Sequence, residues 1–494
     1  MSFLRTLVDQ LLIDLTDHLK HFERKALLNA LLINYESASH SRDWWHKTAA
    51  AMLALRENKT EVMEGMSRHE FKLNGTLQST RNLIEMVLCE APLNGGNMPG
   101  ELDLALMLAQ SAQIFHLSGW SGLIHWDLLE PELEIQPLGD VHAHHHFMDT
   151  VIEPFSKASS EYRYASSANK YAKSLRGATI LENSSDSGVS PFFLDAWLQE
   201  FGVSLDEYRR FVDALENYGI EHHQMIFTFS RAELIALADN SNAGMIIVES
   251  LELVARPEWR TPPKGYSWKD IAPSRFKRRL GLLRRPLIRL EKNGGATYLI
   301  NPALVREGFS SMVGNYYDGS YADDHLGPAM RRYAGMARER DGADFNKRVA
   351  SRMEQLGWKV DREVRLTKAL QKGFNRDYGD IDVLAWNGNS GRILIIECKD
   401  LQFKKTYGEI AEQLSDYRGW ASTDGKKRDS LRKHLDRMEI LREHIGELAN
   451  YLGLGTIGNI ESHLVFSHPV PMMFSTTLCK SMAATHTYDS LACV

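Results

Sequence analysis

Hydrophobic residues in the first quarter of the chain recur with the period of an amphipathic helix. In segment 1–21 the apolar positions fall three or four residues apart, at Leu4, Leu7, Val8, Leu11, Leu12 and Leu15. Segments 42–55 and 101–118 repeat this pattern, and a glycine-rich loop precedes the second of them. We therefore expect residues 1–130 to form a helical N-terminal domain.

The helical period continues through the middle of the chain. It predicts helices over 191–203 and 205–218, and Ser204 is placed to cap the second helix. Residues 131–255 are therefore expected to be a mainly helical middle region.

The pattern changes in residues 256–340. Segment 286–302 has two short apolar runs around Asn293-Gly294, which predicts a β-hairpin with a tight turn. Segment 308–324 is predicted to be loop-rich and to act as a linker or lid. The region as a whole is expected to connect the helical half to the last part of the chain.

Two apolar runs in the last third of the chain are predicted to be neighbouring strands, over 379–385 and 392–400. Residues 387–391 between them (Asn-Gly-Asn-Ser-Gly) favour a turn, so the two strands should pair antiparallel. The four aliphatic residues at 393–396 are typical of a central strand that is buried on both faces.

Charged residues lie inside these apolar strands. Asp382 is in the first, and the second ends in Glu397-Cys398-Lys399. Because side chains alternate along a strand, Glu397 and Lys399 share a face, and the hairpin can bring Asp382 beside Glu397. Buried carboxylates are costly unless they are paired or bind a metal. Two carboxylates suit Mg²⁺ or Mn²⁺, which would activate water for phosphodiester hydrolysis, and Lys399 could orient that water.

This arrangement resembles the PD-(D/E)xK nuclease superfamily, over residues 341–494 only. The resemblance implies a restriction-endonuclease-like domain with the element order α-β-β-β-α-β. Its first helix would be 345–358, followed by a strand at 359–366. After the two strands described above, a helix at 407–420 and a strand at 462–467 would complete the domain.

The resemblance also implies roles for particular residues. Gln413 and Tyr417 match the Q-x-x-x-Y pair of Mrr-type restriction and RecB-type nucleases, and residues four apart share a helix face. The backbone carbonyl of Cys398 is expected to be a further metal ligand. Many members carry a glutamate in the first helix where this chain has Asn346, so the expected site has two carboxylate ligands.

Charge is unevenly distributed, although the net charge is only −6. Residues 1–255 hold 19 basic and 35 acidic side chains, whereas segment 275–289 holds seven basic ones and no acid. This basic segment could contact the phosphates of a nucleic acid, or it could form salt bridges with the acidic N-terminal half. The candidate nucleic-acid-binding residues are Arg275, Lys277, Arg278, Arg279, Arg284 and Arg285.

A narrow apolar stripe follows the Gln413/Tyr417 helix. Its members recur in steps of four and three: Leu431, Leu435, Met438, Leu441, Ile445, Leu448 and Leu452. The stripe could pack one more helix onto the nuclease-like domain. Alternatively, it could form the seam of a homodimer, whose two active sites would face opposite strands of a duplex.

Composition excludes several classes of protein. The four cysteines form no C-x-x-C pair, which argues against a zinc ribbon and a disulfide framework and favours a reducing compartment. No apolar run is long enough to span a bilayer, so we expect a cytoplasmic protein with no membrane contact. Four histidines between His142 and Asp149 invite a zinc hypothesis, but no second cluster has suitable ligand spacing.

The predicted fold is α+β or α/β, with a mainly helical N-terminal and middle region before a nuclease-like αβββαβ domain. The predicted activity is a Mg²⁺- or Mn²⁺-dependent endonuclease that cuts DNA rather than RNA, in bacterial defence or in DNA repair. Two alternatives stay open: an inactive nucleic-acid-binding or scaffold protein, and a nuclease effector controlled by a ligand or partner protein through the N-terminal region. The predicted catalytic residues are Asp382, Glu397, Lys399, Gln413 and Tyr417.

Overall fold

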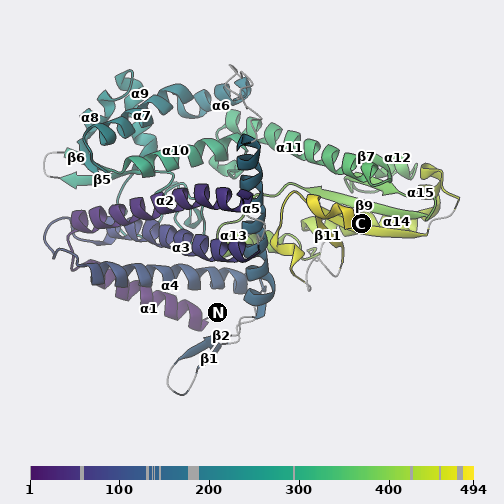
Figure 1. Cartoon of the computed structure of the whole chain (residues 1–494), viewed down its shortest axis with the longest axis horizontal. Coiled ribbons are helices and arrows are strands. Elements are labelled where there is room, and N and C mark those ends of the chain that lie inside the picture. The colour runs from purple at the N-terminus through teal and green to yellow at the C-terminus, as the bar shows by residue number, and fades with distance from the viewer. Residues whose placement is uncertain are drawn as a thin grey trace. The chain divides into compact units, whose positions relative to one another are not determined.

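The chain forms two compact units in the computed structural model (Figure 1). The N-terminal unit comprises residues 1–121, 164–337 and 406–408, and the C-terminal unit comprises 122–163, 338–405 and 409–494. The structure describes residues 2–55, 60–128, 133–135, 137, 140–143, 146–175, 189–292, 295–422, 427–455, 458–475 and 482–493.

Four long helices form the first part of the N-terminal unit and lie side by side in Figure 1: α1 (Ser2–Leu19), α2 (Arg24–Leu55), α3 (Thr60–Glu90) and α4 (Glu101–His125). Their apolar faces meet in a core that includes the fully buried Leu15, Leu27 and Leu31. The prediction of a mainly helical N-terminal region is confirmed.

Helices around a small sheet form the second part of the N-terminal unit. The sheet has the strand order β3-β6-β5-β4. The elements in chain order are α6 (Pro191–Phe201), α7 (Leu205–Glu221), β3 (Phe227–Ser230), α8 (Arg231–Ala236), α9 (Ser241–Leu251), β4 (Glu252–Leu253), β5 (Leu287–Lys292), β6 (Gly295–Ile300) and α10 (Pro302–Tyr317), with short 3-10 turns at Trp268–Asp270 and Asp323–His325.

Two local predictions are confirmed in this unit. Helix α7 begins where the sequence places it, because the Ser204 hydroxyl accepts from the Glu207 N–H and the Glu207 carboxylate accepts from the Ser204 N–H. Strands β5 and β6 form the expected antiparallel hairpin, with Ile288 opposite Leu299. The Asn293-Gly294 turn itself lies outside the described residues.

The prediction of a loop-rich linker at 308–324 was wrong for its first half, which belongs to α10. Asn301 caps this helix by accepting from the Leu304 N–H at 2.8 Å, and Pro302 occupies its first turn. Phe309 and Met312 are buried on its inner face. Glycines and polar residues within 308–317 hid this helical pattern; Gly308 is one of the buried residues of the helix.

The C-terminal unit is built on a five-stranded sheet with the order β11-β10-β9-β8-β7. Strands β7, β8 and β9 pair antiparallel, whereas β10 runs parallel to both β9 and β11. The strands are β7 (Lys359–Arg365), β8 (Asp380–Trp386), β9 (Arg392–Lys399), β10 (Asn459–Phe466) and β11 (Ala484–Thr487).

Helices cover both faces of this sheet. On one face, α11 (Pro328–Gln355) packs the buried Phe345 and Val349 against β8, β9 and β10, so the helix predicted at 345–358 exists but begins earlier. On the other face, α14 (Ser430–Glu443) and α15 (Ile445–Leu452) bury Met438 and Leu448 against the sheet. Most of the apolar stripe therefore packs against the sheet of its own unit, which agrees with the interpretation of the stripe as a packed helix.

Helix α13 (Tyr407–Ser415) ends earlier than the predicted 407–420. The Asp429 carboxylate accepts from the backbone N–H groups of Arg418 and Trp420, and Gly419 has φ +73°, so the chain leaves the helical path. The remaining elements are β1 (Leu133–Ile135), β2 (Val141–Ala143), a π-helical turn (Met148–Ile152), α5 (Glu153–Leu175), α12 (Leu366–Ala369) and 3-10 turns at Pro471–Met473 and Tyr488–Cys493.

Candidate active site

Asp382 and Glu397 lie opposite each other at the end of the β8–β9 ladder. The paired register ends with Val383 opposite Ile396, and the next position along the same register places the two acids opposite each other. Residues opposite one another in an antiparallel pair project to the same face. One Asp382 carboxylate oxygen accepts from the backbone N–H of Cys398 at 2.8 Å, which fixes the carboxylate against β9.

Lys399 completes the group of charges on this face. Its Nζ lies 2.7 Å from the Glu397 carboxylate, and Glu397 itself is only 7% exposed. The Lys399 side chain is more exposed and gives the cluster access to solvent. The structure thus brings together Asp382, Glu397 and Lys399, the three residues that carry the sequence-based hypothesis. We call Asp382 and Glu397 the acid pair.

Helix α14 adds two side chains that the sequence-based hypothesis did not include. Arg437 donates one nitrogen to the Glu397 carboxylate and another to the Asp380 carbonyl at 2.7 Å. The His434 Nδ1 lies 3.8 Å from Glu397, and its Nε2 is 2.9 Å from the Ser462 hydroxyl. The sequence contains an indication that His434 is buried, because it lies at the helical spacing of the apolar stripe. It contains no such indication for Arg437.

Burial and mutual repulsion perturb the acid pair. Burial, and then the charge of Glu397, raises the pKa of Asp382 to about 6. Burial also works to raise the pKa of Glu397, but the charges of Lys399 and Arg437 outweigh it and the pKa is lowered. Burial lowers the pKa of His434 to about 4, so this ring is neutral at pH 7. At that pH two carboxylates therefore face two cations.

The donor set fits a divalent ion held by two carboxylates. Two carboxylates that repel each other in a buried site are relieved by a cation, and Mg²⁺ commonly takes one or two protein carboxylates with water and phosphate oxygens. Each oxygen of Glu397 accepts a hydrogen bond from one cation. Because a carboxylate oxygen has two lone pairs, each of these oxygens keeps one that could bind a metal. Within the described residues, no group of three or more His, Cys, Asp or Glu could hold a metal.

The remaining residues that the resemblance links to the site have less direct evidence. Asn346 belongs to α11, which packs on the face of the sheet opposite Glu397. Gln413 is buried in α13, and Tyr417 lies in the turn beyond it with its ring 6.0 Å from that of Phe466. The predicted roles of Gln413, Tyr417 and the Cys398 carbonyl stay predictions.

The basic segment folds largely into the N-terminal unit. Arg278 forms a buried pair with Glu85, with both oxygens at 2.8 Å, and Arg279 pairs with Asp270 at 2.6 Å. Arg285 donates to the Glu252 carbonyl. These contacts agree with the salt-bridge interpretation of the segment. The remaining candidates, Arg275, Lys277 and Arg284, are half-buried.

In the histidine run considered as a zinc site, His144, His145 and the side chain of His142 lie outside the described residues. In the described part of the chain, we find no helix with the length and hydropathy required to cross a bilayer.

The chain matches a known family of proteins. A family model described as "anti-phage protein Upx-like" matches residues 1–491, which include both units. No curated protein and no solved structure matches the chain. The family description supports a role in defence against phage.

Proposed function

Since the chain belongs to the Upx-like family of anti-phage proteins, we propose that its C-terminal unit is a metal-dependent nuclease that cuts phage DNA. The observation that carries this proposal is the convergence of Asp382, Glu397 and Lys399 on one face of the β8–β9 hairpin. A buried acid pair with a raised carboxyl pKa is more often a functional site than a stabilising one, because its ionisation costs folding energy.

In this proposal Asp382 and Glu397 would hold Mg²⁺ or Mn²⁺, and the Cys398 carbonyl would be a further ligand. When bound, the ion lowers the pKa of a coordinated water and offsets charge on the phosphoryl oxygens. Asp382 is kept in place by the Cys398 N–H, so its carboxylate needs little reorganisation to bind the ion.

Lys399 and Arg437 supply positive charge beside the reacting phosphate. Burial works to lower the pKa of Lys399, but the Glu397 carboxylate outweighs it and raises the pKa, so the amine stays protonated at neutral pH. A protonated amine can orient a water or offset the negative charge that develops on the phosphate. The choice of DNA over RNA rests on the resemblance to restriction and repair nucleases.

A cleavage assay tests the proposal directly. Purified full-length protein is incubated with plasmid and linear DNA in Mg²⁺, Mn²⁺ or EDTA, beside Glu397→Gln, Lys399→Gln and a control, Lys359→Gln, at an exposed position of β7. We expect metal-dependent cutting that both site variants reduce by at least about 100-fold and the control keeps. DNA left intact by the wild type with every metal would sink the proposal.

Two observations favour a second function. Asn346 stands where many nucleases carry a glutamate, and Arg437 already binds Glu397, so this unit could have kept the fold as an inactive nucleic-acid-binding or scaffold protein. The same experiment separates the two functions when DNA binding is measured by mobility shift in EDTA. Binding without cutting under every metal would favour the scaffold.

A further inference from the structure

A buried ring nitrogen beside the acid pair has no hydrogen-bond partner. His434 projects from α14 and is only 1% exposed. Its Nε2 is 2.9 Å from the hydroxyl of Ser462 in β10, whereas its Nδ1 has no partner among the described residues and lies 3.8 Å from the Glu397 carboxylate. This distance is too long for a hydrogen bond. Buried polar atoms without a partner are rare in native proteins, so the Nδ1 requires an explanation.

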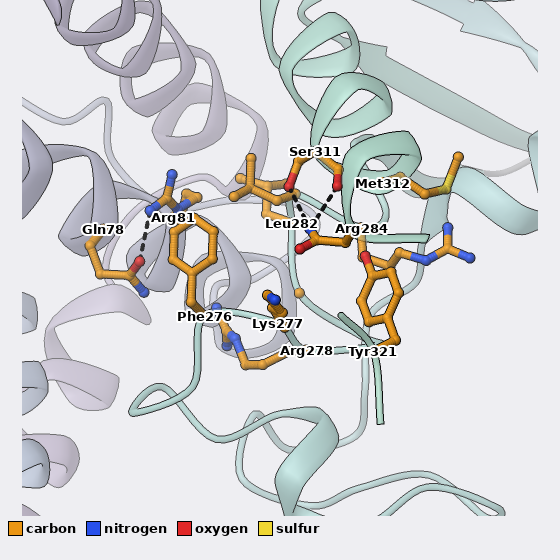
Figure 2. A pocket seen from close by; sticks show the side chains of 13 residues that line it. Gln78, Arg81, Phe276, Lys277, Arg278, Leu282, Arg284, Ser311, Met312 and Tyr321 are labelled. Atoms are coloured by element: carbon orange, nitrogen blue, oxygen red, sulfur yellow. Dashed lines mark hydrogen bonds between the residues drawn. The ribbon is translucent and has the colours of Figure 1, made fainter. Parts of the chain in front are cut away.

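Other buried nitrogens without a partner lie where water offers an explanation. The Nε of Arg278 and the Nη1 of Arg284 belong to side chains that line a hollow of the N-terminal unit (Figure 2). A water molecule in such a hollow can accept a hydrogen bond from either nitrogen. The Nδ1 of His434 differs from both, because the group that it faces is a carboxylate of the proposed site.

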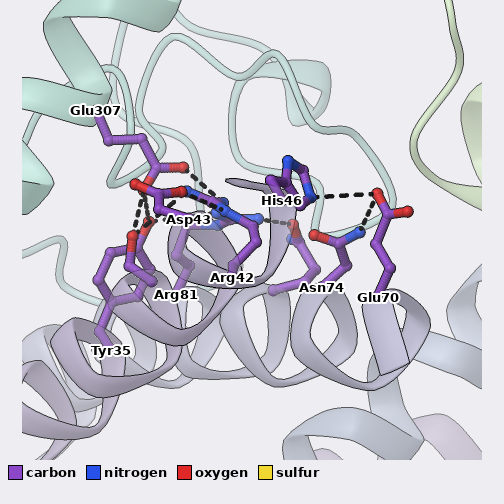
Figure 3. A network of polar contacts seen from close by, with 10 residues as sticks. Tyr35, Arg42, Asp43, His46, Glu70, Asn74, Arg81 and Glu307 are labelled. Carbon is purple, nitrogen blue, oxygen red and sulfur yellow. Dashed lines mark hydrogen bonds and ion pairs between the residues drawn. The ribbon is translucent and has the colours of Figure 1, made fainter. Parts of the chain in front are cut away.

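A second approach of a histidine to a glutamate shows what burial changes (Figure 3). In the N-terminal unit the Nε2 of His46 lies 3.7 Å from the buried Glu70 carboxylate, which is nearly the separation found at His434. The His46 side chain is 46% exposed, so solvent reaches its ring. The ring of His434 is enclosed, and solvent screens its interaction with Glu397 much less.

The surroundings of the His434 ring favour one position for its proton. Burial lowers the pKa of His434 to about 4, so the neutral ring has one N–H at pH 7. With the proton on Nε2, a lone pair of Nδ1 would face the charged carboxylate of Glu397. With the proton on Nδ1, the N–H dipole is attracted to that charge, and the Ser462 hydroxyl donates to Nε2. The second arrangement replaces a repulsion by an attraction.

The two oxygens of Glu397 have different neighbours. Oε2 accepts from Arg437 and faces the Nδ1 of His434, and both of these side chains come from α14. Oε1 contacts Lys399 at the end of β9. Because a carboxylate oxygen has two lone pairs, α14 can engage both lone pairs of Oε2 and leave Oε1 one for an ion. Hydrogen bonds of an active site are often long before the ligand binds and shorten when it does.

We propose that His434 is a positioning residue of the acid pair: its Nδ1–H, fixed by the Ser462 hydroxyl on the other side of the ring, holds Oε2 of Glu397 so that Oε1 is presented to the metal ion. This inference rests on the proposed nuclease function and names a further residue of that site. Side chains that orient metal ligands in this way typically contribute about 10- to 100-fold to metal affinity.

Nitrogen NMR of the metal-free, full-length protein tests the position of the proton without any metal or cleavage reaction. The protein is labelled with ¹⁵N-histidine, and the His434 signals are assigned by their loss in His434→Asn. We expect the ring proton on Nδ1, with Nε2 as the acceptor. A proton on Nε2 would overturn the proposal, because Nδ1 would then have nothing to donate to Glu397.

Calorimetric titration with Mn²⁺ tests the positioning role. Asparagine carries its amide nitrogen near the place of Nδ1, and glutamine carries its amide nitrogen near that of Nε2. We therefore expect His434→Gln to weaken Mn²⁺ binding about tenfold, whereas His434→Asn keeps most of the affinity. His463→Gln is the control, since His463 is also buried but lies on the opposite face of the sheet from Glu397. It should change the melting temperature alone.

The outcomes separate this role from the nuclease proposal. A wild type that binds no Mn²⁺ would overturn the proposed function and the positioning role with it. A wild type that binds Mn²⁺ and cuts DNA, with equal affinity in His434→Gln or an equal loss in His434→Asn and His434→Gln, would overturn the positioning role alone. If His434→Gln does not fold, Ser462→Ala decides in its place: weaker Mn²⁺ binding supports the role, and unchanged binding overturns it.

Discussion

The acid pair of the C-terminal unit and the Arg278–Glu85 pair of the N-terminal unit both bury charge, but with a different balance. In the C-terminal unit two carboxylates face Lys399 and Arg437, and each carboxylate oxygen of Glu397 has a cationic partner. Burial and the neighbouring Glu397 charge leave Asp382 with a raised pKa. In the N-terminal unit one buried arginine meets one buried carboxylate, because Arg278 donates to both oxygens of Glu85 at 2.8 Å.

This difference indicates which of the two places gains from a ligand. A cluster whose two acids repel each other gains from a cation that both acids share. An arginine that donates to both oxygens of one carboxylate is already paired, and it loses stability when that carboxylate is removed. The comparison therefore assigns a metal to the acid pair and a structural role to the Arg278–Glu85 pair.

The largest expected loss of stability comes from removing the carboxylate that pairs with the buried Arg278. Glu85→Gln leaves Arg278 charged and buried without this partner, which should cost about 3–5 kcal/mol. Urea unfolding followed by fluorescence measures the loss, and Asp17→Asn in the exposed Lys20–Asp17 pair is the control, for which we expect little change. A loss for Glu85→Gln no larger than the control's would contradict the pairing described for this unit.

A smaller loss is expected on the other side of the comparison. Arg437→Gln removes one of the two cations on Glu397, and the loss should be about 2–3 kcal/mol because Lys399 still compensates. The variant should also raise the pKa of Glu397. Arg442→Gln, exposed on the same helix, is the control in the same unfolding experiment. Equal stabilities of the two variants would show that Glu397 does not depend on Arg437.

The raised pKa of Asp382 predicts a pH effect of definite sign. The carboxyl holds its proton more tightly in the folded protein, with a pKa of about 6 against 3.8, so wild-type stability should fall as the pH rises through this window. Asp382→Asn cannot ionise and should lose this slope, a relative gain on the order of 1–2 kcal/mol above about pH 6. Parallel melting curves across that range measure it; a difference independent of pH would refute the assigned shift.

The smallest effect is expected from crowding the Arg278 side chain. Gly281→Ala would place a methyl group 3.3 Å from that side chain, which must shift by a few tenths of an ångström, at a cost of about 1 kcal/mol. Gly314→Ala, on a helix face with nothing within 4 Å, is the matched control in the same unfolding experiment. A Gly281→Ala protein as stable as the wild type would contradict this close approach.

Local patterns predicted much of the fold. Strand alternation placed Asp382 and Glu397 on one face, the Ser204 cap located the start of α7, and Asn293-Gly294 indicated the hairpin. Each of these signals lies within a few residues of the structure that it specifies. The end of α13 was missed because it depends on Asp429, which is 9 residues beyond Trp420 in the chain.

Contacts between distant segments could not be predicted in this way. Arg437 reaches Glu397 across 40 residues, and Arg278 reaches Glu85 across 193. One sequence shows that these side chains are charged but not which partners they meet. The charge of the basic segment was therefore visible in the sequence, whereas the partners of its buried arginines were not.

Titration of Mn²⁺ into the full-length protein, followed by calorimetry and by the electron spin resonance of the free ion, tests the central claim most directly. We expect saturable binding that Asp382→Asn and Glu397→Gln each weaken by at least about tenfold, since one ligand is lost, and that Lys359→Gln leaves unchanged. Mn²⁺ binding of equal strength in the wild type and Glu397→Gln, or none in the wild type, would contradict the account of the acid pair as a metal site.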